Sequence, residues 1–188
     1  AGADPLGPAN VLTLMTGVTT GAAISGQSRI NANAKSPISG GIGDSQGGGF
    51  FPAELKFAGF DGIVIRGKAP KPVYLWVSDG KYELRDASHL WGKITGEVEA
   101  MLKQELSDPN IEVAQAGPAG ERGVRFSAII NMSNRANGRT GLGAVMGSKN
   151  LKAVAVRGHA RPALADREAL QQLAKWGADH FEASDVYG

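Results

Sequence analysis

The chain has 188 residues, a formal net charge of +2 at pH 7, 42% hydrophobic residues and no cysteine. That length suits one domain with a hydrophobic core, and the interspersed charges give no argument for a nucleic-acid or membrane partner. The lack of cysteine excludes disulfides, thiolate zinc sites and iron–sulfur ligation within these residues. No apolar run approaches the roughly 20 residues of a membrane span, and the first residues have no signal-peptide layout, so a cytoplasmic protein is expected.

Short strands, short helices and glycine loops alternate along the chain. In chain order we expect strands at residues 10–15 and 28–34, a glycine loop at 40–49, a helix at 50–59, strands at 62–66, 72–77 and 81–86, a helix at 94–106, strands at 111–116 and 124–130, a helix at 143–149, a strand at 151–156 and a final helix capped by Asp166.

Local signals support several of these boundaries. Pro52 suits a first helical position and Gly59 a helix stop. The dipeptide Asp79–Gly80 lies between two strand-like runs, which is a strong hairpin signal. Residues 62–66 (GIVIR) read as a buried strand because they are almost continuously apolar.

Two stretches about ninety residues apart share one order of parts, which predicts an internal duplication. Residues 62–72 (GIVIRGKAPKP) align with residues 153–162 (AVAVRGHARP), and residues 26–36 align more loosely with 121–133, which places Arg29 opposite Arg125. A duplicated unit with a pseudo-two-fold axis would bring two glycine loops together near that axis. The alternative is convergence of two unrelated segments on ordinary strand–turn chemistry.

Glycine loops that open helices suggest phosphate binding, because exposed backbone N–H groups favour anions. Residues 143–149 (GAVMGSK) have the wrong spacing for a P-loop, and residues 141–147 (GLGAVMG) match a dinucleotide loop only loosely. A free-standing nucleotide-binding module therefore remains an alternative. Arg29, Arg135 and Arg139 flank the glycine loops, where a guanidinium suits phosphate or an acceptor-rich heterocycle, unless they are ordinary surface arginines. His89, His159 and His180 lie far apart and show no metal-ligand spacing.

Four segments together resemble the N-terminal domain of the tungsten-containing aldehyde ferredoxin oxidoreductase family: residues 36–77, 85–93, 117–121 and 134–158. The resemblance implies an α+β duplication whose two sheets, with short helices, form the base for a paired pterin. It implies an enzyme that holds tungsten, or molybdenum, between two pyranopterin dithiolenes and oxidises aldehydes to carboxylic acids. Electrons would leave through a 4Fe–4S cluster to ferredoxin or a similar carrier.

The resemblance also implies roles for particular residues. Arg29 corresponds to an arginine between pterin and cluster. Gln46 and Gly48 correspond to the first pterin loop. The second loop corresponds to Arg135, Ala136, Gly138 and Arg139. In the family, backbone oxygens at the positions of Gln46 and Ala136 bind a magnesium ion that bridges the two pterin phosphates.

This sequence departs from the family pattern at four positions, with Gln46 for the usual Asn, Asn134 for His, Asn137 for Ala and Thr140 for Gly. Backbone ligation of magnesium tolerates a changed side chain, whereas ring-specific contacts from the second loop depend on it.

The resemblance implies that residues 1–162 form the pterin-binding domain, with its first strands missing, and that residues 163–188 begin a helical region. The family's cluster cysteines and proton-transfer residues lie in further helical domains of the same enzyme. We therefore expect this chain alone to be inactive, with those domains, an electron carrier and an aldehyde as partners and an oligomer allowed. A gene continuing into a C-x-x-C-x-x-x-C segment would favour this reading, whereas a stop codon near Gly188 would favour the nucleotide-binding module.

Overall fold

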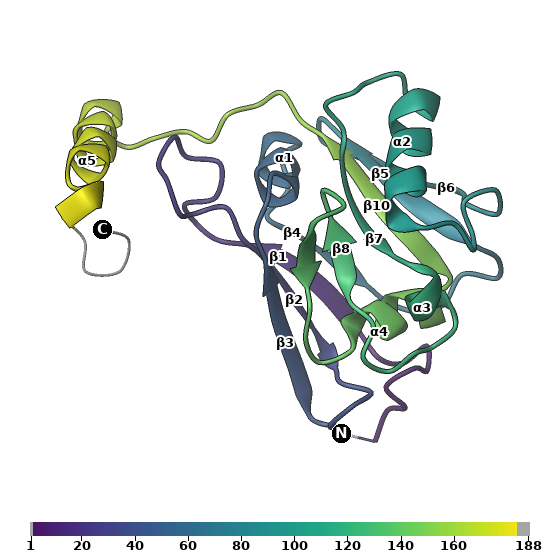
Figure 1. Ribbon diagram of the computed structural model, residues 1–188. Coiled ribbons are helices and arrows are strands. Elements are labelled where there is room, and N and C mark those ends of the chain that lie inside the picture. The colour runs from purple at the N-terminus through teal and green to yellow at the C-terminus, as the bar shows by residue number, and fades with distance from the viewer. Residues whose placement is uncertain (1, 184–188) are drawn as a thin grey trace.

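Two β-sheets packed face to face form the body of the molecule in a computed structural model, which describes residues 2–183 (Figure 1). The smaller sheet has the order β3-β2-β1-β4, with β1 at Leu12–Thr16, β2 at Ile30–Lys35, β3 at Ile42–Gly47 and β4 at Gly62–Ile65. The larger sheet has the order β6-β5-β10-β7-β8-β9, with β5 at Val73–Ser78, β6 at Lys81–Asp86, β7 at Glu112–Ala116, β8 at Ile129–Asn131, β9 at Arg135–Asn137 and β10 at Leu151–Arg157. Neighbouring strands are antiparallel except β5 and β10, which run parallel.

Short helices connect and cover these strands. They are α1 at Phe51–Phe57, α2 at Thr95–Glu105, α3 at Pro118–Glu121, α4 at Leu142–Ser148, α5 at Arg167–Asp179 and a 3-10 turn at Phe181–Ala183. The expected α+β fold of two sheets with short helices is confirmed. Pro52 lies in the first turn of α1, Asp79–Gly80 joins β5 to β6, and Asp166 caps α5 by accepting from the Ala169 N–H at 2.9 Å.

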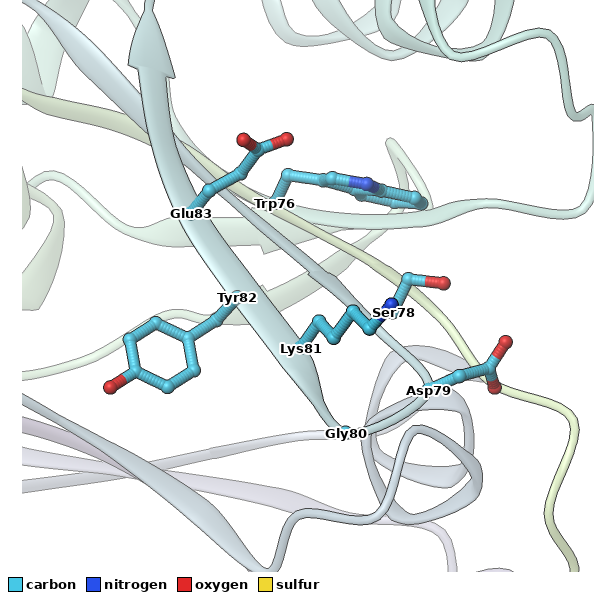
Figure 2. A pocket seen from close by; sticks show the side chains of 7 residues that line it. All are labelled: Trp76, Ser78, Asp79, Gly80, Lys81, Tyr82 and Glu83. Atoms are coloured by element: carbon cyan, nitrogen blue, oxygen red, sulfur yellow. The ribbon is translucent and has the colours of Figure 1, made fainter.

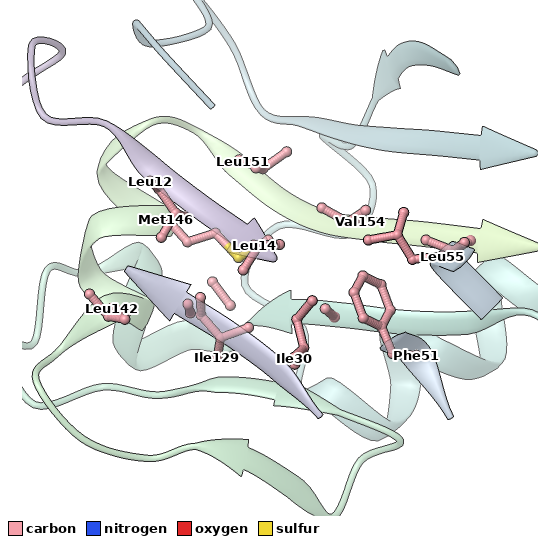
Figure 3. Close-up of a cluster of buried hydrophobic side chains, with 14 of the residues drawn as sticks. Leu12, Leu14, Ile30, Phe51, Leu55, Ile129, Leu142, Met146, Leu151 and Val154 are labelled. Atoms are coloured by element: carbon pink, nitrogen blue, oxygen red, sulfur yellow. The ribbon is translucent and has the colours of Figure 1, made fainter. Parts of the chain in front are cut away.

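The main hydrophobic core lies between the two sheets. Inward-facing residues alternate along β2, where Ile30, Ala32 and Ala34 are buried and the residues between them are half-buried. Side chains of α1 and α4 complete this core (Figure 3). A second core lies on the outer face of the larger sheet, where Val98 and Leu102 of α2 pack among the strand residues Tyr74, Val113 and Ala155.

The predicted duplication is present in the topology. The first repeat (β1, β2, β3, α1, β4) has the strand order β3-β2-β1-β4, and the second repeat (β7, β8, β9, α4, β10) has the order β9-β8-β7-β10. In both repeats the first strand is antiparallel to its two neighbours. Convergence on similar local turns would not produce the same strand order and direction twice, so the duplicated unit is confirmed.

Strand registers define which residues of the two repeats are equivalent. Leu14 pairs with Ala32 and Ile63, and Ala114 pairs in the same way with Asn131 and Val154. Ile63 and Val154 are the residues that the alignment of 62–72 with 153–162 places together. The looser alignment is wrong by three positions, because Ile30 is equivalent to Ile129 and Arg29 therefore to Ala128 rather than Arg125.

Several local predictions are wrong. Residues 42–47, expected in a glycine loop, form β3, and residues 124–128 precede a β8 that is shorter than expected. The sequence pattern did not indicate β9 or α3. The strand β4 is half-exposed rather than buried, because it is the last described strand of its sheet and Val64 is 55% exposed.

The helix α5 stands apart from the body, beyond an extended segment at residues 158–166 (Figure 1). None of its residues is buried, and its apolar residues Leu173 and Trp176 are 54% and 60% exposed. Within residues 2–183, no helix has the length and apolar character needed to cross a membrane.

Candidate functional site

The edge strands β3 and β9 bring the two repeats together. The side chain of Asn137 on β9 is buried and donates to the backbone oxygens of Ile30, at 3.2 Å, and Ser45, at 2.6 Å. Beside this contact, Ser45, Gln46, Gly138 and Arg139 line an open pocket of about 350 Å³. The duplication predicted that two segments would meet near a pseudo-two-fold axis, and the structure places both segments around this pocket.

Arg139 links the rims of this pocket. Its Nε donates to the Asp44 backbone oxygen at 2.9 Å, and its guanidinium lies 3.1 Å from the Asp44 carboxylate. The side chain of Arg139 stays 70% exposed, so this ion pair is screened and leaves most of the guanidinium accessible. Asp44 belongs to β3 and also accepts from Asn33, so it does not form a turn as a glycine-rich loop would suggest.

The glycines of β3 and its flanks divide into two groups. A Cβ at Gly47 would lie 2.9 Å from the Asn137 Oδ1, and one at Gly49 would lie 2.5 Å from the Asn131 Oδ1, so both glycines allow the second repeat to approach. Gly48 and Gly138 differ, because a Cβ there would meet nothing closer than 3.9 Å and 3.6 Å respectively. A side chain at either position would make no more than ordinary van der Waals contact with the protein.

The glycines of α4 have a packing role. Gly141 has a φ of +77°, and Cβ atoms at Gly143 and Gly147 would lie 2.3 Å from the Ala128 oxygen and 2.2 Å from the Gly120 oxygen. Residues 142–147 are all buried. The segment GLGAVMG therefore packs closely against its own chain, which argues against a dinucleotide at these glycines.

The two halves of the pocket are equivalent in backbone. Because Ala32 pairs with Ser45 and Asn131 with Arg135, the register makes Gln46 equivalent to Ala136. The same register makes Gly48 equivalent to Gly138. Gln46, Ala136 and Gly138 are exposed and Gly48 is half-buried, so the backbone of this region is accessible from solvent.

The remaining predicted residues lie around the same region. Arg29 is exposed and directly precedes β2, beside Gly48, since Ile30 pairs with Gly47. Arg135 is exposed on β9, and its Cγ would lie 3.3 Å from a Cβ at Gly49. Arg139 thus lines the pocket, and Arg29 and Arg135 are exposed near Gly48 and Gly49, an arrangement suited to anions.

The buried amides of Asn131 and Asn137 form a polar floor at the junction of the two repeats, which the sequence pattern did not reveal. Both side-chain polar atoms of Asn131, and the Oδ1 of Asn137, are buried without a hydrogen-bond partner among the described atoms. Asn131 lies close to Gly47 and Gly49, and unpaired buried polar atoms are rare in folded proteins. Asparagine at inward positions of a short strand is the signal that could have indicated this floor.

A hollow away from this junction, about 770 Å³ in volume, follows the β5–β6 hairpin and is lined by Trp76, Ser78, Asp79, Gly80, Lys81, Tyr82 and Glu83. Figure 2 shows Lys81 and Tyr82 projecting to opposite sides of β6, so these side chains do not converge on one point. Within residues 2–183, no three histidine or acidic side chains gather as a metal site would require.

Glu112 and Lys152 are charged residues that lie outside the pocket. Burial raises the pKa of the Glu112 carboxyl to about 7; the charge of Lys103 opposes this rise, and the charges of Glu99 and Glu54 add to it. Lys152 is fully buried, donates to the backbone oxygens of Lys93 and Ala116 at 3.0 Å each, and pairs with Glu121. These groups bear on stability rather than on the pocket.

The fold and the pocket define a duplicated α+β domain that presents two equivalent backbone edges at the junction of its halves. The chain belongs to the family described as aldehyde ferredoxin oxidoreductase, N-terminal domain, whose family model matches residues 1–158. A tungsten-containing aldehyde ferredoxin oxidoreductase of Thermococcus kodakarensis is 51% identical over 186 residues, covering 99% of this chain and 31% of that protein. The corresponding enzyme of Pyrococcus horikoshii is 46% identical over 98% of this chain and 30% of its own length.

Two further relatives carry other names. The WOR-like subunit of an aliphatic sulfonate oxidoreductase from Pyrococcus furiosus is 41% identical, covering 90% of this chain and 29% of that protein. The active-site complex of benzoyl coenzyme A reductase with 1,5-dienoyl-CoA contains a chain that superimposes with a TM-score of 0.93 at 39% identity, covering 96% of this chain and 28% of that one. This chain therefore spans about 30% of the length of the curated relatives it matches.

Proposed function

We propose that the pocket between β3 and β9 binds the phosphate ends of a paired pyranopterin cofactor, within an oxidoreductase that converts aldehydes to carboxylic acids. The observation that carries this proposal is the register equivalence of Gln46 with Ala136 and of Gly48 with Gly138. A ligand with two similar halves needs two similar backbone edges, and the duplication supplies them around one pocket.

The residues around the pocket fit such a group. Gly48 and Gly138 leave room for a ligand to approach the backbone, and Arg29, Arg135 and Arg139 supply positive charge for phosphates. Backbone oxygens of Gln46 and Ala136 would hold a magnesium ion between the two phosphates, since magnesium prefers oxygen ligands and commonly joins phosphates to a few protein groups. A site built from backbone oxygens does not depend on a cluster of acidic side chains.

The rest of the proposed function depends on the longer protein. The tungsten, or molybdenum, ion held by the pterins would supply the redox chemistry when bound, and a 4Fe–4S cluster outside this chain would pass electrons to ferredoxin or a similar carrier. Residues 1–162 would be the cofactor-binding domain and residues 163–188 the start of the helical region that covers it. Relatives named for an aldehyde, a sulfonate and benzoyl coenzyme A share this domain, which agrees with substrate choice being made elsewhere.

The proposal is tested by placing a negative charge at the two open glycines. Gly48→Asp and Gly138→Asp fit sterically, because neither position has a positive φ or a neighbouring atom closer than 3.6 Å. Each carboxylate would repel the phosphates, so the full-length enzyme should retain at least tenfold less tungsten and pterin at an unchanged unfolding temperature. Gly96→Asp is the matched control, since it adds the same charge on α2 where nothing lies within 4 Å. Normal metal content in both pocket variants would contradict the proposal.

A further inference from the structure

The two hairpins that carry the two edges of the pocket differ in their support. In the first repeat, β2 and β3 have six residues each and pair along their whole length. In the second repeat, β8 and β9 have three residues each, and β9 is the edge strand of its sheet. A short edge strand with few ladder hydrogen bonds opens easily. The second hairpin therefore depends on contacts from outside its own ladder.

The turn of the second hairpin also has a strained backbone. Met132 and Ser133 are successive non-glycine residues with φ of +50° and +53°, in the left-handed region that a side chain disfavours. In the turn of the first hairpin, residues 36–41, a positive φ occurs at Gly40, which carries no such cost. A strained conformation persists where surrounding contacts hold it in place, and such positions gather at functional sites.

Two contacts hold the strained turn. The Met132 Sδ accepts from the Phe50 backbone N–H at 3.0 Å, at the start of α1 in the first repeat. The Ser133 Oγ donates to the Glu99 Oε2 at 2.6 Å. Glu99 belongs to α2, its side chain is 14% exposed, and its Oε1 accepts from the Lys103 Nζ at 2.9 Å. Because Lys103 orients the carboxylate, the hydroxyl of Ser133 meets an acceptor that is already in place, and a hydrogen bond to a carboxylate is among the strong ones.

We propose that Glu99 and Ser133 are positioning residues for the second half of the cofactor site, an inference that rests on the proposed function. Their hydrogen bond fixes the turn, and the turn fixes β9, which presents the Arg135 side chain and the Ala136 backbone. Arg135 follows Ser133 by two residues and pairs with Asn131 across the hairpin, so a displaced turn displaces Arg135. Other residues line the pocket, so both positioning residues act through the hairpin and not on the ligand.

Amide hydrogen exchange in the full-length protein tests the anchoring. Ser133→Ala removes the hydroxyl, so residues 132–138 should exchange at least about tenfold faster while residues 30–35 of β2 keep their rate. Glu99→Ala should have the same effect, and Glu99→Gln, which keeps an oxygen acceptor, should restore slow exchange. Glu97→Ala is the matched control, since it removes the same charge from an exposed position of the same helix. Unchanged exchange of residues 132–138 in Ser133→Ala would overturn the proposal.

Tungsten retention in the same full-length variants tests the positioning. Ser133→Ala and Glu99→Ala should each lose tungsten during dialysis at least about threefold faster than the native protein, whereas Glu99→Gln and Glu97→Ala should retain it. The double variant should lose it no faster than either single variant, because both substitutions remove one contact. Additive losses would overturn the proposal, since the two residues would then act separately.

The two levels of inference fail in different ways. Faster exchange of residues 132–138 with unchanged tungsten retention would overturn the positioning role of Glu99 and Ser133. That result would leave the proposed cofactor site standing, because Gly48→Asp and Gly138→Asp test the site without altering the hairpin anchor.

Discussion

Replacing Asn137 by alanine should weaken the junction between the two repeats more than an ordinary amide deletion would. The Asn137 side chain is fully buried on β9 and donates to backbone oxygens of Ile30 and Ser45, which belong to the first repeat. Each such hydrogen bond contributes about 1 kcal/mol net, and the lost amide leaves a small cavity, so we expect a destabilisation of about 2–4 kcal/mol. For a chain of this length that corresponds to roughly 5–15 °C in unfolding temperature.

The assay is thermal unfolding followed by circular dichroism, with Asn33→Ala as the matched control. Asn33 also donates an amide hydrogen bond, to the Asp44 Oδ1 at 2.9 Å, but its bond joins β2 and β3 inside one sheet and is only partly buried. We expect the control to lose no more than about 1 kcal/mol. An Asn137→Ala protein as stable as the Asn33→Ala protein would refute the reasoning that this amide holds the repeats together.

Three other changes have expected outcomes. Because the Glu112 pKa is about 7 in the fold against an ordinary 4.5, the folded state keeps a proton that the unfolded state releases, so stability should fall as pH rises from about 4.5 to 7. Glu112→Gln should remove this pH dependence. At pH 8 its free energy of unfolding should exceed that of the native chain by up to about 3 kcal/mol, as measured by urea unfolding at several pH values. Glu121→Gln should cost about 3–5 kcal/mol by the same measurement, since it leaves the fully buried Lys152 without its countercharge; a loss below 1 kcal/mol would argue against the ion pair. Arg29→Ala in the full-length enzyme should weaken cofactor binding by roughly 1.5–3 kcal/mol and affect the stability of the fold less. If the variant keeps its metal content and its rate of reducing an electron-accepting dye, Arg29 is an ordinary surface arginine.

Local chemistry made most of the fold predictable. Pro52, Gly59, the Asp79–Gly80 turn and the Asp166 cap each act within a few residues, and the structure has the elements they indicate. The failures fall where a distant segment decides the conformation. Residues 42–47 read as a loop because of their glycines, yet Gly43 and Gly47 lie in a strand whose small residues allow the second repeat to approach. Strand β9 is too short to show a period.

The candidate site was predictable in position but not in its construction. The repeat indicated that two segments would meet, and the structure places Gln46 near Gly138 and Arg139. The contacts of Arg139 with Asp44 and of Asn137 with Ser45 join residues far apart in sequence, so no local sequence pattern predicts either contact. The polar floor of unpaired amides depends on burial by both repeats, which only the folded arrangement reveals.

The junction of β3 and β9 resembles the contact of a homodimer, in which one surface meets a copy of itself. A separate half-length ancestor would have formed this pocket only after two molecules associated, and therefore in proportion to its concentration. Joining the halves in one polypeptide makes their encounter intramolecular. It also frees each copy to mutate independently. Ser45 and Arg135 occupy equivalent positions with opposite tendencies, one small and buried, the other cationic and exposed. A ligand with two identical halves would thus meet two different neighbourhoods, and the protein would make its two halves inequivalent.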